Sequence, residues 1–218
     1  MPVPDQHPMR ITAIERQKRR PRVNISADGR FVLSLSLALA AEAGLRVGEI
    51  LTPERLEALR RADERQQTHD AALRLLAYRP RSEAEMRFRL ARRGLPPVAV
   101  QEAVDRLLQQ GLLDDDAFAR YWVETRRQSN PRGRRLLRQE LAAKGIGVET
   151  ARQAVAAVAE EEDARRAAEK KAGQLHGQDY ATFRRRLGQF LLRRGFPYET
   201  ARALVEELWR EGSRAAGA

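Results

Sequence analysis

The sequence LRQELAAKGI, residues 137–146, occurs in two further versions, MRFRLARRGL at residues 86–95 and LGQFLLRRGF at residues 187–196. In each version, apolar residues stand eight and four positions before a glycine, and a further apolar residue follows the glycine. Residues four positions apart share one face of a helix, and glycine readily takes the left-handed conformation that ends a helix. The pattern therefore predicts three equivalent helices, each ended by its glycine.

These helices belong to a longer repeat, because Gly94, Gly145 and Gly195 are 51 and 50 residues apart. Apolar residues ten and thirteen positions after each glycine indicate a following helix, and a preceding helix completes each unit. Units of this size form marginal cores alone, so neighbours should support one another in an elongated, curved array. We expect first helices at residues 66–78, 115–127 and 161–175, middle helices at 82–93, 131–144 and 180–194, and last helices at 96–110, 147–160 and 197–210.

The first fifty residues have a different pattern, which indicates β-strands. Polar and apolar residues alternate between Arg10 and Leu37, and Asp28-Gly29 between two such runs predicts a β-hairpin. Thr52 and Pro53 suit the cap and the first position of a helix. The expected fold is mostly α, with an N-terminal arm and β-hairpin segment over residues 1–51, a linking helix over 52–65, three-helix repeats over 66–113, 114–160 and 161–211, and a disordered tail over 212–218.

The composition is strongly basic, with 41 Lys and Arg residues against 30 Asp and Glu and a formal charge of +11. This balance attracts nucleic acids, acidic proteins or anionic membranes. The longest uncharged run, residues 31–41, is shorter than the roughly 20 residues that span a bilayer, so we expect no membrane partner. The absence of cysteine excludes disulfides and thiolate chemistry, and it favours a cytoplasmic location.

The positive charge is concentrated in the predicted middle helices. These three segments hold fourteen basic and three acidic residues, whereas the last helices hold four basic and seven acidic residues. Because equivalent helices of a repeat array tend to lie along one side, we expect a basic ribbon; the alternative is that these arginines only keep helix surfaces soluble. The candidate binding residues are Arg79, Arg81, Arg87, Arg89, Arg92, Arg93, Arg126, Arg127, Arg132, Arg134, Arg135, Arg138, Lys144, Arg184, Arg185, Arg186, Arg193 and Arg194.

Catalytic and metal chemistry find little support. The run 114–116 is three aspartates where a helix is expected to begin, so capping explains it better than a metal cluster. The three histidines are scattered and match no metal motif, and the common phosphate, dinucleotide, acyl-transfer and zinc-protease motifs are absent. We therefore predict a protein that is not an enzyme and needs no cofactor or metal.

Two further groups of residues have structural explanations. The acidic run at 160–163 stands before Arg165 and Arg166, which predicts ion pairs to Glu161 and Glu162 along one helix. Aromatic rings beside arginines can stack on bases, but large rings more often lie in or beside cores. Tyr78, next to two arginines, remains open between these interpretations, and the other rings of this kind are Tyr121, Trp122, Tyr180 and Trp209.

Several stretches of the chain resemble the RecX family of regulatory proteins, which modulate the RecA recombinase. The resemblance rests on LLAYRPRSEAE at residues 75–85, LDDDAFAR at 113–120 and PRGRR at 131–135, continued by QELAAKGI at 139–146. The segment GLRVG at residues 44–48 is similar to the leader of that family. The three-repeat layout covers about residues 66–211.

The resemblance implies a monomeric inhibitor that lies in the groove of the RecA–DNA filament. Such a protein would lower ATP hydrolysis, strand exchange and co-protease stimulation, and thereby modulate recombination, DNA repair and the SOS response. Blocking the groove, capping filament ends and displacing RecA are all compatible with this implication. The alternative is a protein that binds single- or double-stranded DNA weakly and non-specifically through its basic helices, since the acidic last helices disfavour helix-turn-helix reading of bases.

Overall fold

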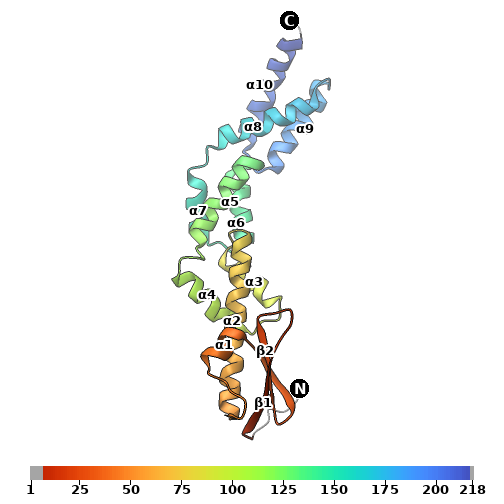
Figure 1. The fold of residues 1–218 in the computed structure, drawn as a ribbon. Coiled ribbons are helices and arrows are strands. Elements are labelled where there is room, and N and C mark those ends of the chain that lie inside the picture. The colour runs from red at the N-terminus through yellow and green to blue at the C-terminus, as the bar shows by residue number, and fades with distance from the viewer. Residues whose placement is uncertain (1–6, 217–218) are drawn as a thin grey trace. The chain divides into compact units, whose positions relative to one another are not determined.

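The chain begins with a small antiparallel sheet and continues as a series of helices (Figure 1). This computed structural model describes residues 7–216. Two compact units are present. The first contains the residues up to Tyr78 together with Arg87–Gln110, and the second contains Arg79–Met86 together with the residues from Gly111 onward.

The sheet confirms the predicted hairpin. Its strands are β1 (Met9–Arg16), β2 (Arg22–Ala27), β3 (Arg30–Ser36) and β4 (Ile50–Leu51), in the order β3-β2-β1-β4. Between β2 and β3, Asp28 and Gly29 both have positive φ angles, 49° and 73°, as the tightest hairpin turns require. Apolar residues of β1, β2 and β3 are buried on one face, and Leu51, Leu56 and Leu59 complete this core.

Two elements of this segment were not predicted. Helix α1 (Leu37–Glu42) begins where the predicted strand ends, and the Oγ of Ser36 accepts a hydrogen bond of 3.1 Å from the Leu39 N–H. The other is the two-residue strand β4, which pairs with the start of β1. Strand β1 begins at Met9, within the predicted segment over residues 1–51, of which residues 1–6 lie outside the described part of the chain.

Helix α2 (Pro53–Tyr78) is one continuous helix, whereas the sequence pattern predicts a linking helix over 52–65 and a separate first repeat helix over 66–78. No glycine or proline interrupts the chain between these two segments, so nothing ends the helix there. As predicted, α2 begins at Pro53, and the Oγ1 of Thr52 accepts a hydrogen bond from the Arg55 N–H.

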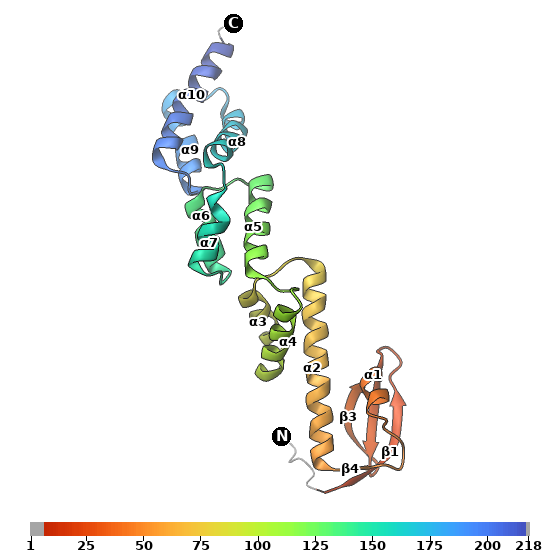
Figure 2. The same cartoon turned by 90° about the vertical axis from the view of Figure 1, so that its left-hand side faces the viewer.

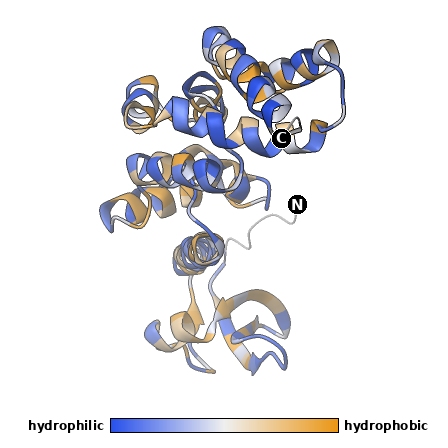
Figure 3. Ribbon diagram, turned by 90° about the horizontal axis from the view of Figure 1, so that it is seen from above, coloured by the Kyte–Doolittle hydropathy of each residue, from blue (hydrophilic) through white to orange (hydrophobic). Residues whose placement is uncertain are grey.

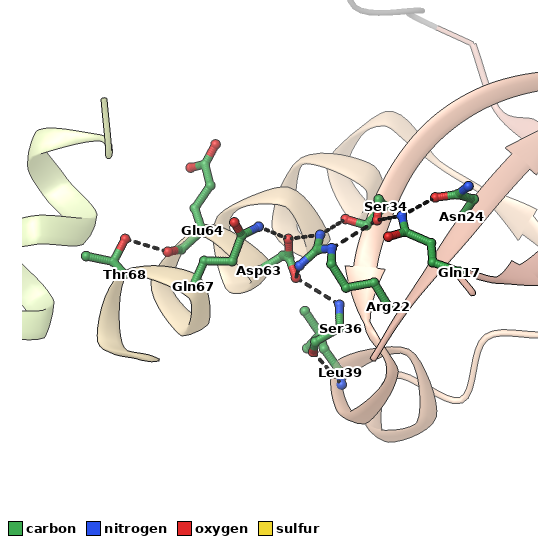
Figure 4. Close-up of polar contacts among 10 residues, drawn as sticks. All are labelled: Gln17, Arg22, Asn24, Ser34, Ser36, Leu39, Asp63, Glu64, Gln67 and Thr68. Atoms are coloured by element: carbon green, nitrogen blue, oxygen red, sulfur yellow. Dashed lines mark hydrogen bonds and ion pairs between the residues drawn. The ribbon is translucent and has the colours of Figure 1, made fainter. Parts of the chain in front are cut away.

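A buried carboxylate fixes α2 to the sheet (Figure 4). Asp63, only 4% exposed, accepts a hydrogen bond of 2.7 Å from Arg22 of β2 and one of 3.0 Å from the backbone N–H of Ser36. Gln67, one turn further along α2, donates to the same carboxylate. Because this charge is both paired and hydrogen-bonded, it can be buried between the sheet and α2. Leu56 and Leu59 of α2 belong to the same core as the sheet.

The remaining helices confirm three tandem three-helix repeats. The first repeat combines the end of α2 with α3 (Glu83–Ala91) and α4 (Pro97–Gln109). The second consists of α5 (Asp115–Ser129), α6 (Arg134–Ala143) and α7 (Val148–Ala156). The third consists of α8 (Glu160–Ala172), a short 3-10 turn (Gly173–Leu175), α9 (Tyr180–Arg193) and α10 (Tyr198–Ala216) (Figure 2).

The repeated sequence pattern has the predicted structural meaning. The three anchor glycines have φ angles of 73°, 81° and 84°, so each ends its middle helix in the left-handed conformation. The apolar residues before them are fully buried. They are Met86, Leu137 and Leu187 at eight positions before the glycines, and Leu90, Leu141 and Leu191 at four positions before them. Figure 3 shows hydrophilic and hydrophobic residues on the same helices, as expected for helices that bury one face.

Some helix ends differ from the predictions. Helix α6 begins at Arg134 rather than near 131, because Gly133 is its N-cap, and α7 ends at Ala156 rather than at 160. Helix α10 extends to Ala216, so residues 212–216 are helical where a disordered tail was predicted. The last two residues of that predicted tail lie outside the described part of the chain.

Within the second unit, middle helices meet end to end. At the start of α3, the Oγ of Ser82 donates a hydrogen bond of 2.6 Å to the carbonyl oxygen of Lys144, at the end of α6. At the start of α6, the N–H of Gly133 donates a hydrogen bond of 2.9 Å to the carbonyl oxygen of Arg194, at the end of α9. Both contacts join the positive end of one helix dipole to the negative end of the next.

Both junctions also require the anchor glycine. A Cβ atom on Gly145 would collide with the Cβ of Ala84, and one on Gly195 would lie 2.5 Å from the Cβ of Leu136. Gly94 has the same conformation, but a Cβ there would meet no atom within 4 Å. Gly145 and Gly195 therefore serve both to end a helix and to admit the neighbouring one.

Helix α9 departs from this repeated arrangement at its N-terminus. Ser82 and Gly133 each stand twelve residues before their anchor glycine, and the corresponding residue of the third repeat is Phe183. Phe183 lies inside α9, because that helix begins four residues earlier than α3 and α6 relative to the glycine. Its N–H is already bonded to the carbonyl oxygen of Asp179 at 2.9 Å, and its buried ring packs on Trp209.

Candidate functional site

The eighteen basic residues proposed from the sequence divide into two groups of nine. The first group contributes to the fold through ion pairs, hydrogen bonds or ring contacts, and it comprises Arg79, Arg81, Arg87, Arg126, Arg127, Arg132, Arg134, Lys144 and Arg194. The second group is exposed on the middle helices or just beyond their ends. One ring contact in this group places the guanidinium of Arg92 5.7 Å from the centre of the exposed Phe88 ring, and the group comprises Arg89, Arg92, Arg93, Arg135, Arg138, Arg184, Arg185, Arg186 and Arg193.

Glu85, at the start of α3, holds two of the proposed binding residues. The Nη1 of Arg81 lies 2.8 Å from one carboxylate oxygen of Glu85, and the Nη1 of Arg79 lies 3.0 Å from the other. Burial alone would raise the pKa of Glu85, but the hydrogen bond and charge of Arg79, with the charges of Lys144 and Arg81, outweigh it and lower the pKa below the usual 4.5. Arg81 is itself buried, so this cluster stabilises the entry into α3.

Glu140 of α6 has the corresponding role in the second repeat. It accepts hydrogen bonds of 2.9 Å from the Nε of Arg126 and from the indole N–H of Trp122, and it pairs with Arg132. The guanidinium of Arg126 and the ammonium of Lys144 lie 4.4 Å and 5.0 Å from the centre of the Trp122 ring. Burial, followed by the charges of Arg126 and Arg194, lowers the pKa of Arg132.

Asp163 of α8 was not recognised from the sequence. Its carboxylate is fully buried, lies 2.9 Å from the Nε of Arg127 and also pairs with Arg166. The hydrogen bond that Arg127 donates to Asp163 is the main cause that raises the pKa of Arg127. The predicted partners of Arg165 and Arg166 were therefore wrong, since Arg165 pairs with Glu207 and Glu169 instead. Helical spacing carries no information about the contacts of Asp163 with Arg127 and of Arg165 with Glu207, which join residues 36 and 42 positions apart.

Three other arginines of the first group donate hydrogen bonds to residues in other segments of the protein. Arg134 donates from its Nη2 to the carbonyl oxygen of Val158 at 2.7 Å, although its side chain is otherwise exposed. Arg194 donates to the carbonyl oxygen of Pro131 at 3.2 Å, and Arg87 donates to the side chain of Gln101 at 2.7 Å. Substituting these residues would change local packing as well as surface charge.

Seven members of the exposed group supply positive charge that the described part of the fold does not neutralise. In the described part of the chain, no ion pair is formed by Arg93, Arg135, Arg138, Arg184, Arg185, Arg186 or Arg193. Arg135 and Arg185 occupy the same position of their repeats, ten residues before the anchor glycine. Exposed guanidinium groups of this kind can form bidentate hydrogen bonds with carboxylates or phosphates.

The aromatic residues also divide between core and surface. Trp122 packs on Phe118, and Trp209 packs on Phe183 and Tyr180. Tyr78 is the last residue of α2, and it is 84% exposed. The core interpretation therefore holds for the two tryptophans but not for Tyr78.

The aspartate run serves as two helix caps. Asp114 accepts a hydrogen bond of 2.9 Å from the Ala117 N–H and caps α5, as predicted. Asp115 caps a different helix, because it accepts a hydrogen bond of 2.8 Å from the Glu83 N–H at the start of α3. Burial raises the pKa of Asp115. Among the residues that the structure describes, no group of three or more His, Asp and Glu side chains is arranged to hold a metal ion.

None of the helices between residues 7 and 216 combines the length and the apolar character needed to cross a bilayer.

Four family models match successive parts of the chain. Residues 9–52 match the regulatory protein RecX N-terminal domain, and residues 69–107, 114–155 and 159–212 match the first, second and third three-helix domains of RecX. Among similar proteins, the regulatory protein RecX of Halalkalibacterium halodurans is 32% identical over 85% of this chain and 73% of its own length. That of Lactobacillus delbrueckii subsp. bulgaricus is 31% identical over 91% of this chain and 74% of its own length.

Solved structures show the same similarity. A crystal structure of regulatory protein RecX has a TM-score of 0.67 and 26% sequence identity, and it covers 91% of this chain and 99% of its own. The crystal structure of RecX from Lactobacillus salivarius has a TM-score of 0.58 and 25% identity, covering 67% of this chain and 97% of its own.

Proposed function

Since the chain belongs to the RecX family of regulatory proteins, we propose that it binds the filament that RecA forms on DNA and lowers the activities of that filament. These activities are ATP hydrolysis, strand exchange and co-protease stimulation, so that the chain modulates recombination, DNA repair and the SOS response. It acts in the cytoplasm as a monomer, through binding rather than through catalysis.

One observation supports this proposal, namely the set of exposed arginines that form no ion pair with any residue between 7 and 216. On α6 they are Arg135 and Arg138, and on α9 they include Arg184 and Arg185. A nucleoprotein filament offers both acidic side chains and phosphates, and guanidinium groups bind either. Repetition of the same charge in successive repeats favours an extended partner, because each repeat can contact a successive part of it.

The experiment replaces Arg135 and Arg138 together with alanine and measures RecA ATPase activity on single-stranded DNA over a range of concentrations. Arg134 is kept, because its hydrogen bonds to the Val158 carbonyl stabilise the repeat. We expect at least a tenfold higher concentration for half-inhibition. The control is Arg152→Ala. Arg152 belongs to the last helix of the second repeat, and its side chain is 74% exposed.

Binding of the same variants to naked DNA separates the proposed function from its alternative, non-specific DNA binding. The exposed arginines also support that alternative, because contacts between basic side chains and phosphates are the source of non-specific DNA binding. Loss of inhibition with unchanged DNA binding supports contact with RecA, whereas a parallel loss supports DNA binding as the primary activity. Equal inhibition by the double variant and the parent would remove the basis of both.

A further inference from the structure

The third repeat contains a groove between α9 and α10. These two helices lie side by side (Figures 1 and 2) and enclose a groove of about 840 Å³, within the range of about 300–1,000 Å³ usual for ligand sites. Its lining includes two tyrosines, two unpaired arginines and a glycine, which are Tyr180, Tyr198, Arg184, Arg185 and Gly188.

The glycine accounts for the depth of the groove. Gly188 stands in the interior of α9, where glycine lowers helix stability, and a Cβ atom there would meet no atom within 4 Å. The corresponding residues of the other repeats, seven positions before the anchor glycine, are Arg87 and Arg138. In the first repeat, the side chain of Arg87 reaches across to Gln101 of α4. In the third repeat, this space is empty, and a ligand can approach the helix backbone.

Two exposed rings stand at the ends of the groove. Tyr198 is 62% exposed at the start of α10, and Tyr180 is 41% exposed at the start of α9. Tyr180 packs on Trp209 with a centroid distance of 5.3 Å, which fixes its ring while part of it stays in solvent. Because α9 and α10 form a hairpin, the two rings are separated by most of the length of α9.

The charge along the groove is positive. Arg184 and Arg185 form no ion pair with other described residues, whereas the carboxylate of Glu206 is paired with Arg202 at 3.4 Å. Fixed aromatic rings combined with unpaired arginines are the combination with which proteins bind single-stranded nucleic acids. A peptide helix would instead need a continuous apolar stripe, and here Thr182 and Gln189 interrupt the apolar lining.

We propose that the groove between α9 and α10 is a subsite for single-stranded DNA, in which unpaired bases stack on Tyr198 and Tyr180 while Arg184 and Arg185 bind the phosphates. In a duplex each base is stacked between neighbouring bases, which cover its faces, so the subsite selects single strands over duplexes. This inference does not depend on inhibition of RecA, because it concerns binding of a bare strand to this protein alone.

The test measures binding of a fluorescein-labelled oligothymidylate to the full chain by anisotropy, with Tyr198→Ala and Gly188→Leu as the variants. Loss of stacking in Tyr198→Ala should weaken binding between about 5-fold and 150-fold. Gly188→Leu should weaken it as well, because the leucine fills the groove, while the melting temperature stays the same or rises. The control is Val148→Ala, at the corresponding position of α7, which is 85% exposed and should bind as the parent does.

Two comparisons distinguish stacking from simple charge attraction. A strand with abasic sites should bind the parent more weakly than oligothymidylate does, and Tyr198→Ala should remove that difference. A duplex of the same length should bind the parent and Tyr198→Ala equally. The subsite is refuted if the parent does not bind the strand, if both variants keep parental affinity, or if duplex affinity falls as much as strand affinity. Intact strand binding by both variants refutes the subsite whether or not their inhibition of RecA changes, and it leaves the proposed function standing.

Discussion

The Nε of Arg127, near the end of α5, lies 2.9 Å from the Oδ2 of Asp163, near the start of α8, and this carboxylate is fully buried. The contact joins the first helix of the second repeat to the first helix of the third. A buried carboxylate without its partners would be costly, so the pair fixes the register of the two repeats.

Replacing Asp163 with asparagine should lower the free energy of unfolding by about 2–4 kcal/mol, since it leaves two arginines without their shared partner. Arg127 keeps 27% of its side chain exposed, which places the loss toward the lower end of this range. Urea denaturation followed by circular dichroism measures the effect. Glu161→Gln changes an exposed carboxylate of the same helix and should cost less than about 0.5 kcal/mol. Equal stability of the two variants would contradict a structural role for Asp163.

The two functions of the anchor glycines can be separated by comparing Gly145→Ala with Gly94→Ala. Both positions have a left-handed backbone, so alanine should cost about 1–2 kcal/mol at each. At Gly145 the new methyl group also collides with Ala84, which should add about 1–3 kcal/mol of overpacking. Thermal and urea unfolding of the two variants give the difference. The same loss of stability at both positions would show that the structure around Ala84 relaxes to accept the methyl group without a further loss of stability.

The cluster around Glu85 predicts a pH dependence. A carboxyl group whose pKa is lowered by folding contributes stability that is present above its unfolded value and is lost as the pH falls through the folded value. Glu85→Gln should therefore be less stable than the parent by about 1–3 kcal/mol at pH 7, and the two proteins should converge below pH 4.5. Urea unfolding at a series of pH values tests this. Glu57→Gln, at a 51% exposed position, should follow the parent throughout.

Salt dependence reports how many exposed arginines meet phosphates. For a single strand, each phosphate contact contributes about 0.7 to the slope of log affinity against log salt concentration. Arg184→Ala and Arg185→Ala should each reduce this slope by about that amount, whereas Arg165→Ala, whose guanidinium is paired with Glu207, should leave it unchanged. Anisotropy titrations between low and moderate salt provide the slopes. Unchanged slopes in the first two variants would show that these residues do not contact phosphates.

Local patterns predicted the framework of the fold. The glycine spacing, the apolar residues around it, the Asp28-Gly29 turn and the start of α2 at Pro53 all depend on neighbouring residues, and all are present. Prediction failed where α2 was divided although no local signal ends a helix there, and where α10 continues through Gly212, a residue type that commonly follows the end of a helix.

The candidate site was harder to predict, because an arginine in a sequence carries no mark of its partner. Arg126 and Arg127 are adjacent and look alike, yet one pairs with Glu140 and the other with Asp163, 14 and 36 residues away. Helical spacing identifies residues on one face of a helix, but it does not indicate which carboxylate of another helix meets them. Which arginines are structural and which are exposed therefore depends on tertiary contacts that the sequence pattern does not contain.

The early start of α9 determines how this protein can be lengthened by design. A junction of the kind made by Gly133 needs an open backbone N–H at the beginning of the receiving helix, and the equivalent group on Phe183 is already used within α9. A further unit attached beyond α10 would find no place to dock. A longer protein should instead be made by duplicating residues 114–158 in tandem. Each inserted copy then keeps a residue equivalent to Gly133, whose N–H can bond to the end of the next middle helix.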